Sequence, residues 1–314
     1  MTATATGIGS FPGATQRDFD EALAVVLGEY GEAGDADGEV SLMPFLPEVP
    51  GRGAIAQMTG RTLGLLADGD LWDADLQPEG WRLTGTSGAP PIDQRRARSL
   101  LSQDLDSLEE RAHGFAGPIK TQAAGPWTLA ATVERPRGDK LVADHGARRD
   151  LAQALAAALA EHVADLRRRT PDAERIVVQI DEPALPAVLG GRIPTASGFG
   201  KHRVIHPPEA DQGLRWVCEA IVDAGAEPWV HCCAGDVPIA LVLGAGARGI
   251  AIDLDRLAPG GHDALAQALE EGASVALGVI PSSGPMGSRS TRALPPEKLL
   301  ISWSAASVGP SSAK

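Results

Sequence analysis

The 314-residue sequence contains little cysteine, tyrosine and phenylalanine. It has only three cysteines, one tyrosine and five phenylalanines. An odd and small number of cysteines excludes the disulfide framework that holds small secreted domains together. Cys232 and Cys233 are neighbours, and a disulfide between adjacent residues would close a strained ring. We therefore expect free thiols in a reducing compartment, which indicates the cytoplasm.

Long apolar segments and an excess of positive charge are also missing. No apolar run reaches the roughly 18 residues of a membrane-spanning helix, and residues 1–13 (MTATATGIGSFPG) lack the basic and apolar regions of a signal peptide. The chain has 28 Lys and Arg against 41 Asp and Glu, a net charge of −13. Because nucleic-acid-binding proteins concentrate positive charge in a patch, we expect neither a nucleic-acid partner nor a membrane.

Eight short apolar runs alternate with helical patterns along the chain. Most of them are apolar at every position, which is typical of parallel strands covered on both faces. The runs are 4–11, 40–46, 117–124, 175–181, 227–233, 249–254, 274–280 and 298–303. They predict an α/β fold, and either a TIM (β/α)8 barrel or a doubly wound sheet would account for the alternation. We expect the barrel, because polar residues follow several runs and a barrel gathers those strand ends on one face.

Three amphipathic helices and one irregular region complete this outline. Helical stripes cover 19–30, 151–166 and 214–222; Asp150 is the expected N-cap of the second stripe and Gly225 ends the third. Cys218 falls on the third stripe and is expected in the core. Residues 47–116 are rich in Gly, Pro and Asp, and we expect a loop-rich insertion, with loops or a small hairpin over the active face. Without a visible linker, 1–314 is expected to be a single domain.

His231 and Cys233 form a candidate metal site. A catalytic zinc ion is held by three protein ligands, commonly imidazole nitrogen and thiolate sulfur, with one position left open. In an extended strand, residues i and i+2 point to the same side, so both could face one ion while Cys232 faces away. Asp253, at the end of the next run, could be a third ligand, and so could Asp255. The alternative is that these are small residues packed at a barrel rim.

Two further strand ends carry polar or flexible residues. Asp181 and Glu182 end an apolar run, where adjacent carboxylates suit recognition of an amine, general-base chemistry or the capping of the next helix. Gly7, Gly9 and Ser10 end the first run, where the backbone can approach a ligand closely. They do not form a phosphate-binding loop, because the required glycine spacing and lysine are missing.

Five motifs in this order resemble the catalytic, C-terminal domain of cobalamin-independent methionine synthase, which shares a barrel superfamily with uroporphyrinogen decarboxylase. GIGSFPG resembles the family's IGSFP, AAGPWTLAA its TGPVTIL turn, and VQIDEPAL its QIDEPAL. WVHCC resembles its H-x-C zinc pair, and GIAIDLD the strand that bears its acidic zinc ligand. Each motif alone is weak, whereas the ordered set is specific and spans most of the chain.

This resemblance implies a zinc-dependent S-methyltransferase that forms methionine from homocysteine, or acts on a similar small thiol. It implies Zn²⁺ as the cofactor, held by His231, Cys233 and Asp253, the last in the place of a glutamate. Zinc would keep the substrate thiol as a thiolate near neutral pH, where a free thiol of pKa about 8.5 is mostly protonated. The thiolate would then attack a methyl group held in line with it.

The resemblance also implies the residues of the amino-acid site. Asp181 would receive the amino group of homocysteine, Ile8 and Ser10 would line the site, and Glu48 would correspond to a substrate-binding glutamate in the second loop. The methyl donor would be methyltetrahydrofolate, or a methylcorrinoid as in stand-alone relatives. These four residues form the predicted substrate site.

The sequence departs from the family's pattern near its C-terminus. The family's fourth zinc ligand, a cysteine after the last strand, has no counterpart, and residues 304–314 form an atypical tail in place of the last helix. The last βα unit of the barrel is therefore expected to be incomplete. Ser283 or a neighbour occupies the place of the family's proton-transferring histidine. Two alternatives follow: a catalytically impaired or divergent barrel that binds a ligand or partner, or a relative with other thiol chemistry or metal-free decarboxylase-like chemistry.

Overall fold

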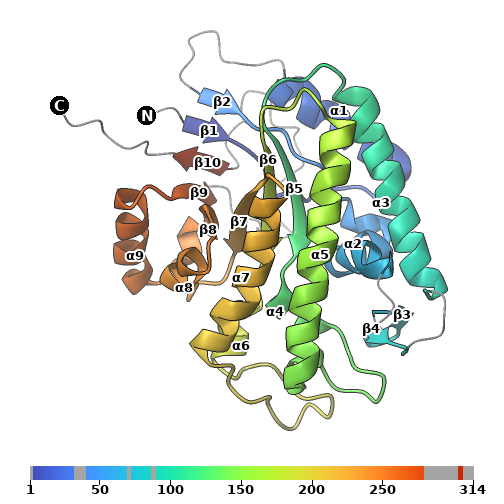
Figure 1. The fold of residues 1–314 in the computed structure, drawn as a ribbon, viewed down its shortest axis with the longest axis vertical. Coiled ribbons are helices and arrows are strands. Elements are labelled where there is room, and N and C mark those ends of the chain that lie inside the picture. Colours follow the sequence, from blue (N-terminus) through green and yellow to red (C-terminus); the bar gives the residue numbers. More distant parts are fainter. Residues whose placement is uncertain (1–2, 32–39, 69–71, 86–89, 279–302, 307–314) are drawn as a thin grey trace, which may run out of the picture.

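One eight-stranded sheet with helices packed around it forms the centre of the fold (Figure 1). The computed structural model describes residues 3–31, 40–68, 72–85, 90–278 and 303–306. The strands of this sheet are β1 (Ala3–Ala5), β2 (Val40–Leu42), β5 (Ile119–Ala124), β6 (Ile176–Asp181), β7 (Glu227–Cys232), β8 (Gly249–Asp253), β9 (Ser274–Gly278) and β10 (Trp303–Ala306). Their order is β2-β1-β10-β9-β8-β7-β6-β5.

The sheet is mixed, with five consecutive parallel strands from β5 to β9. β1 and β2 are parallel to each other, whereas β10 is antiparallel to both β1 and β9. Seven of the eight predicted runs overlap with strands, which confirms an α/β fold with a five-stranded parallel segment. The last run, 298–303, lies outside the described residues except for Trp303, where β10 begins. Because β10 runs antiparallel to its neighbours, the described sheet is not all-parallel, and a (β/α)8 barrel is not confirmed.

A backbone bridge joins the two edges of this sheet. Phe45, just beyond β2, forms an isolated parallel bridge with Lys120 on β5. The Leu46 amide donates to the Lys120 carbonyl at 2.9 Å, and the Lys120 amide donates to the Pro44 carbonyl at 2.9 Å. The sheet consequently has an inner face and an outer face, and side chains alternate between them along each strand.

Nine α-helices lie within the described residues: α1 (Gln16–Gly31), α2 (Met58–Leu65), α3 (Ile92–Arg111), α4 (Pro126–Thr132), α5 (His145–Arg169), α6 (Leu185–Leu189), α7 (Pro207–Asp223), α8 (Ile239–Gly244) and α9 (Pro259–Glu270). The predicted cap of the second stripe is wrong. α5 begins at His145, and the Asp144 carboxylate accepts a hydrogen bond from the Ala147 amide at 2.9 Å, so Asp150 lies inside the helix. Gly225 follows α7 at φ +87°, as predicted. No helix in the described part of the chain is both long and apolar enough to cross a membrane.

Residues 47–116 contain α2, α3 and a hairpin of β3 (Ala74–Gln77) and β4 (Gly80–Leu83). The fully buried Gln94 of α3 fastens the hairpin to α2. Its Oε1 accepts from the Ala74 amide, and its Nε2 donates to the Leu63 and Trp72 carbonyls, each at 2.9 Å. The assignment of 1–314 to one domain stays a prediction.

The two faces of the sheet pack against different material. The outer face joins the helices in one large apolar cluster, which includes Ile180, Val230 and Cys232. The inner face has a much smaller apolar cluster of Met43, Val177, Trp229, Ala251 and Ala276. Each fully buried Val or Ile contributes about 1.5–3 kcal/mol to stability, so most of the hydrophobic stabilisation comes from the outer face.

Candidate functional site

Polar side chains gather on the inner face of β5, β6 and β7. They are Lys120, Gln122, Gln179, Asp181 and His231, all buried. Lys120 and Gln122 on β5 are two positions apart, as are Gln179 and Asp181 on β6, so the members of each pair point to the same side. The register pairs Ala124 with Asp181 and Asp181 with His231, which places Asp181 and His231 side by side near the carboxyl ends of their strands.

Lys120 is the centre of this polar group. Its side chain is fully buried, and its Nζ donates to Gln179 Oε1 at 3.0 Å and to the Ile8 carbonyl at 3.4 Å. Gln179 Nε2 in turn donates to Asp181 Oδ1 at 2.7 Å and to the Ile8 carbonyl at 3.1 Å. Of the predicted site residues, Ile8 thus joins the network through its backbone and Asp181 through its carboxylate.

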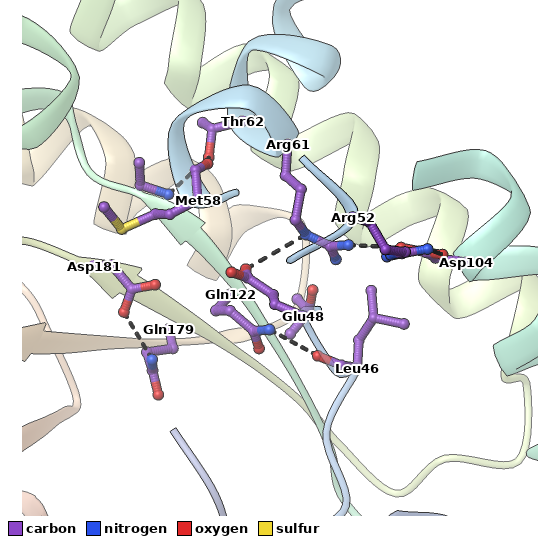
Figure 2. A network of polar contacts seen from close by, with 12 residues as sticks. Leu46, Glu48, Arg52, Met58, Arg61, Thr62, Asp104, Gln122, Gln179 and Asp181 are labelled. Carbon is purple, nitrogen blue, oxygen red and sulfur yellow. Dashed lines mark hydrogen bonds and ion pairs between the residues drawn. The ribbon is translucent and has the colours of Figure 1, made fainter. Parts of the chain in front are cut away.

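Glu48 and Ser10 are joined through their backbones. The Glu48 amide donates to the Gly9 carbonyl at 2.8 Å, and the Phe11 amide donates to the Glu48 carbonyl at 2.7 Å. The Ser10 residue is exposed, whereas Glu48 is 5% exposed. Figure 2 shows the Glu48 carboxylate pointing to the side where Asp181 lies. All four predicted substrate residues therefore lie around the carboxyl ends of β1, β2 and β6.

A chain of ion pairs extends from Glu48 to the helical layer (Figure 2). Arg61 of α2 lies 3.4 Å from Glu48, measured from Nε to Oε1. Its Nη1 donates to Asp104 Oδ2 of α3 at 2.7 Å. Asp104 also accepts two hydrogen bonds, at 2.8 and 2.7 Å, from the guanidinium of Arg52. Positive and negative side chains thus alternate along this chain, in the order Arg52, Asp104, Arg61 and Glu48.

Burial shifts the ionisation of the acidic and basic groups in opposite directions. Loss of solvation raises the pKa of Asp181, and the nearby charge of Glu48 raises it further by a smaller amount. Burial also raises the pKa of Glu48, although Arg61 opposes the shift. Burial lowers the pKa of Lys120 from its ordinary value. A cationic ligand placed between these carboxyl groups would favour their charged forms.

Glu182 caps a helix, but not the helix that follows it in sequence. Its carboxylate accepts hydrogen bonds from the Trp127 amide at 2.9 Å and from the amide and hydroxyl of Thr128 at 2.8 and 2.7 Å, all at the start of α4. Burial raises the pKa of Glu182 to about 7, against the effect of these bonds. Gly125 permits this contact, since a Cβ there would collide with the Glu182 carboxylate.

The predicted metal ligands lie near one another without forming a complete site. His231 is 4% exposed, its Nδ1 lies 3.2 Å from the Ala251 carbonyl, and burial lowers its pKa to about 4, so the imidazole is neutral. Cys233 and Asp253 are partly exposed and follow paired positions of β7 and β8. Within the described ranges, however, no group of three or more His, Cys, Asp or Glu side chains could hold a metal ion. Their side chains are chemically suited to zinc, but among the described residues they are not gathered into a three-ligand group, so zinc binding stays a prediction.

Cys232 has the orientation that the sequence predicted. It is fully buried in the outer-face cluster, and burial raises its thiol pKa to about 12. Ser283 lies outside the described residues, so the prediction about it is not tested. Of the predicted tail 304–314, only 304–306 are described, and they belong to β10.

A small hollow separates His231 from the first strand. It is lined by Thr6, Gly7, Ile8, Gln179, Trp229, His231, Ala251 and Ala276. None of this space is wide enough for a water molecule. Gly249 allows the Trp229 indole to lie against β8, because a Cβ there would come within 2.6 Å of the ring.

Sequence reasoning missed Lys120, Gln122, Arg61 and Asp104. A signal for the first two was present, because a lysine and a glutamine two residues apart interrupt an otherwise apolar run (IKTQAA). In a strand buried on both faces, such a pair marks the face that is not packed on helices. Arg61 and Asp104 gave no comparable signal, since charged residues on helices are usually solvated.

Comparisons with known proteins leave the family open. No protein-family model matches the chain, and no curated protein matches it. A solved structure of a B12-independent methionine synthase from Shewanella sp. W3-18-1, in complex with selenomethionine, is similar to this chain at 17% sequence identity and a TM-score of 0.39. The match covers 56% of this chain and 48% of that chain, and a likeness this distant assigns neither family nor function.

Proposed function

We propose that this chain binds a small amino-acid thiol of the homocysteine type and acts as an S-methyltransferase of the methionine-synthase type. The observation that carries the proposal is the pair of buried carboxyl groups, Glu48 and Asp181, whose charges act on each other. Burial raises the pKa of both groups, so a bound ammonium would relieve the cost of their ionisation. The five sequence motifs support the same reading.

In this proposal the four predicted substrate residues surround the amino-acid part of the ligand. Asp181 and Glu48 bind its ammonium group, and the segment from Ile8 to Ser10 lines the site. Lys120, through Gln179, holds the Asp181 carboxylate in place. We further propose a TIM barrel with an incomplete last βα unit, located in the cytoplasm, and methyltetrahydrofolate or a methylcorrinoid as the methyl donor.

Zinc is a separate part of the proposal. His231, Cys233 and Asp253 are its candidate ligands, but the described residues do not assemble them as a three-ligand group. We therefore derive no step through a metal. Zinc content of the purified protein, compared with that of Cys233→Ser, tests this part: about one equivalent that is lost in the variant supports it, and protein without zinc refutes it.

Calorimetric binding of L-methionine and L-homocysteine tests the amino-acid site. We expect Asp181→Asn and Glu48→Gln each to weaken binding at least tenfold, because a charge-assisted hydrogen bond contributes about 1.5–3 kcal/mol. 4-(Methylthio)butanoate, which lacks the ammonium group, is the matched control and should bind weakly and equally to all three proteins. If the wild type bound L-methionine and 4-(methylthio)butanoate with equal affinity, the proposed site would be refuted.

The second candidate is a divergent or catalytically impaired barrel that binds the ligand without transferring a methyl group. The sequence favours it, because the family's fourth zinc cysteine and its proton-transferring histidine have no counterpart in this chain. Methionine binding without methyl transfer from either donor, in zinc-supplemented protein, would select this candidate.

A further inference from the structure

Arg61 lies between two carboxylates but bonds only one of them. Its Nη1 donates to Asp104 Oδ2 at 2.7 Å, whereas its Nε stays 3.4 Å from Glu48 Oε1. An N–H···O hydrogen bond has its optimum near 2.9–3.0 Å. Among the described residues, both Arg61 Nε and Glu48 Oε1 are buried without a hydrogen-bond partner. A donor and an acceptor thus lie side by side in the interior and remain unsatisfied.

The anchoring of Asp104 explains this separation. Its carboxylate is fully buried on α3 and accepts three hydrogen bonds from two guanidinium groups. Arg52 is itself held by Gln16 Oε1 at 2.9 Å and by the Phe19 ring, whose centroid lies 4.6 Å from its guanidinium carbon. Asp104 therefore cannot follow Arg61 toward Glu48, and Arg61 stays with the carboxylate that is fixed.

We propose that Asp104 is a positioning residue for the ligand site: it holds the Arg61 guanidinium away from Glu48 and so keeps Glu48 Oε1 available to the ammonium of the ligand. A guanidinium prefers to bind a carboxylate through two parallel hydrogen bonds. Without Asp104, Arg61 would close onto Glu48 in this way and occupy the oxygen that the ligand needs. The inference rests on the proposed function for the identity of the ligand.

Other charged groups face Glu48 from the elements packed around it. Lys120 lies on β5, Asp181 on β6 and Asp104 on α3, in addition to Arg61 on α2. Lys120 is occupied by Gln179 and the Ile8 carbonyl. Among the described residues, Arg61 is therefore the cationic side chain that forms an ion pair with Glu48. Its position decides whether Glu48 is available.

Asp104→Asn tests the proposal, because it removes the charge and keeps the shape. A crystal structure of the ligand-free variant should show Arg61 hydrogen-bonded to Glu48 through two nitrogen atoms. L-Methionine should bind at least about tenfold more weakly, which corresponds to one charge-assisted hydrogen bond. The affinity for 4-(methylthio)butanoate should stay unchanged. If Arg61 remains in its present position in the variant, the proposal is overturned. If the wild-type protein binds methionine and the variant binds it equally well, the proposal is overturned too.

The double variant Asp104→Asn/Arg61→Met separates positioning from a structural role. With no guanidinium to close onto Glu48, methionine affinity should recover to within about threefold of Arg61→Met alone, a non-additivity expected of coupled residues. Circular dichroism checks that each variant is folded. If Asp104→Asn is unfolded, the double variant is compared with Arg61→Met instead. Further loss of affinity in the double variant would overturn the proposal. If the wild type binds no methionine, the proposed function fails, while the position of Arg61 in Asp104→Asn still decides this inference.

Discussion

The two faces of strands β5 to β8 differ in the chemistry of the side chains that they bury. On the outer face, Ile180, Val230 and Ile252 pack on helices without a polar atom among their side chains. On the inner face, one residue away along the same strands, stand Asp181, Gln179 and His231. Both faces are buried, so exposure to solvent does not cause the difference.

This contrast separates residues that stabilise the fold from residues that are available for function. Burial of an apolar side chain stabilises the protein, whereas burial of an ionisable group costs free energy unless it is paired. The inner face retains several such groups whose pKa values are shifted by burial. Groups with shifted pKa values are common at functional sites.

The largest effect is expected on the outer face. Ile180 is fully buried among the strands and helices. Ile180→Ala should lower the free energy of unfolding by about 3 kcal/mol, because the change removes buried methyl groups and leaves a cavity. Urea denaturation measures the effect. A loss below 1 kcal/mol would mean that the outer face is not the main source of stability.

A pH-dependent effect of intermediate size is expected from His162 of α5. Burial lowers its pKa to about 4 from an ordinary value of 6.5, and its Nε2 lies 3.3 Å from Thr121 Oγ1 on the outer side of β5. The unfolded state binds the proton more readily below pH 6.5, so stability falls as the pH drops toward 4.

His162→Gln should remove this contribution, because the amide does not titrate and can still bond Thr121. Between pH 7 and pH 5 the wild type should lose about 2 kcal/mol more than the variant. Urea denaturation of both proteins at the two pH values gives the comparison. Parallel losses in the two proteins would show that His162 is not the group responsible.

The smallest effect on stability is expected from Asp181, the inner-face neighbour of Ile180. Asp181→Asn keeps an acceptor for Gln179 Nε2 and removes a carboxyl group whose ionisation is opposed by burial. The free energy of unfolding at pH 7 should change by less than about 1 kcal/mol, although the same variant should weaken the proposed ligand binding at least tenfold. A destabilisation as large as that of Ile180→Ala would remove the distinction between the faces.

The sequence predicted the strands well because their apolar runs are short and uninterrupted. The parallel β5 to β9 lie within predicted runs, and the outward orientation of Cys232 follows from the alternation of side chains. The direction of β10 could not be predicted, because a short strand carries no local signal of whether its partner is parallel or antiparallel. The cap of α5 was misplaced for a similar reason: Asp144 and Asp150 are both suitable residues, and only the path of the chain distinguishes them.

The candidate site was predictable only in part. Alternation brings Asp181 and His231 to one face, and the motifs drew attention to Glu48 and Ile8. The contacts of Arg61 and Asp104 depend on how α2 and α3 pack on each other, and that packing is a tertiary property without a sequence pattern of its own. The metal site stays a prediction, because spacing along two strands does not by itself determine whether three side chains reach a common point.

The three hydrogen bonds of Gln94 have a consequence for motion. The hairpin β3–β4 is tied by one buried amide to α2 and to its own first strand, while Arg82 of β4 donates two hydrogen bonds to Glu134, which lies beyond α4. Opening the hairpin would require the buried bonds of Gln94 and the partly buried bonds of Arg82 to break together. We therefore expect it to move together with α3 rather than as a hinged cover, and its amide protons should exchange with solvent as slowly as those of the sheet.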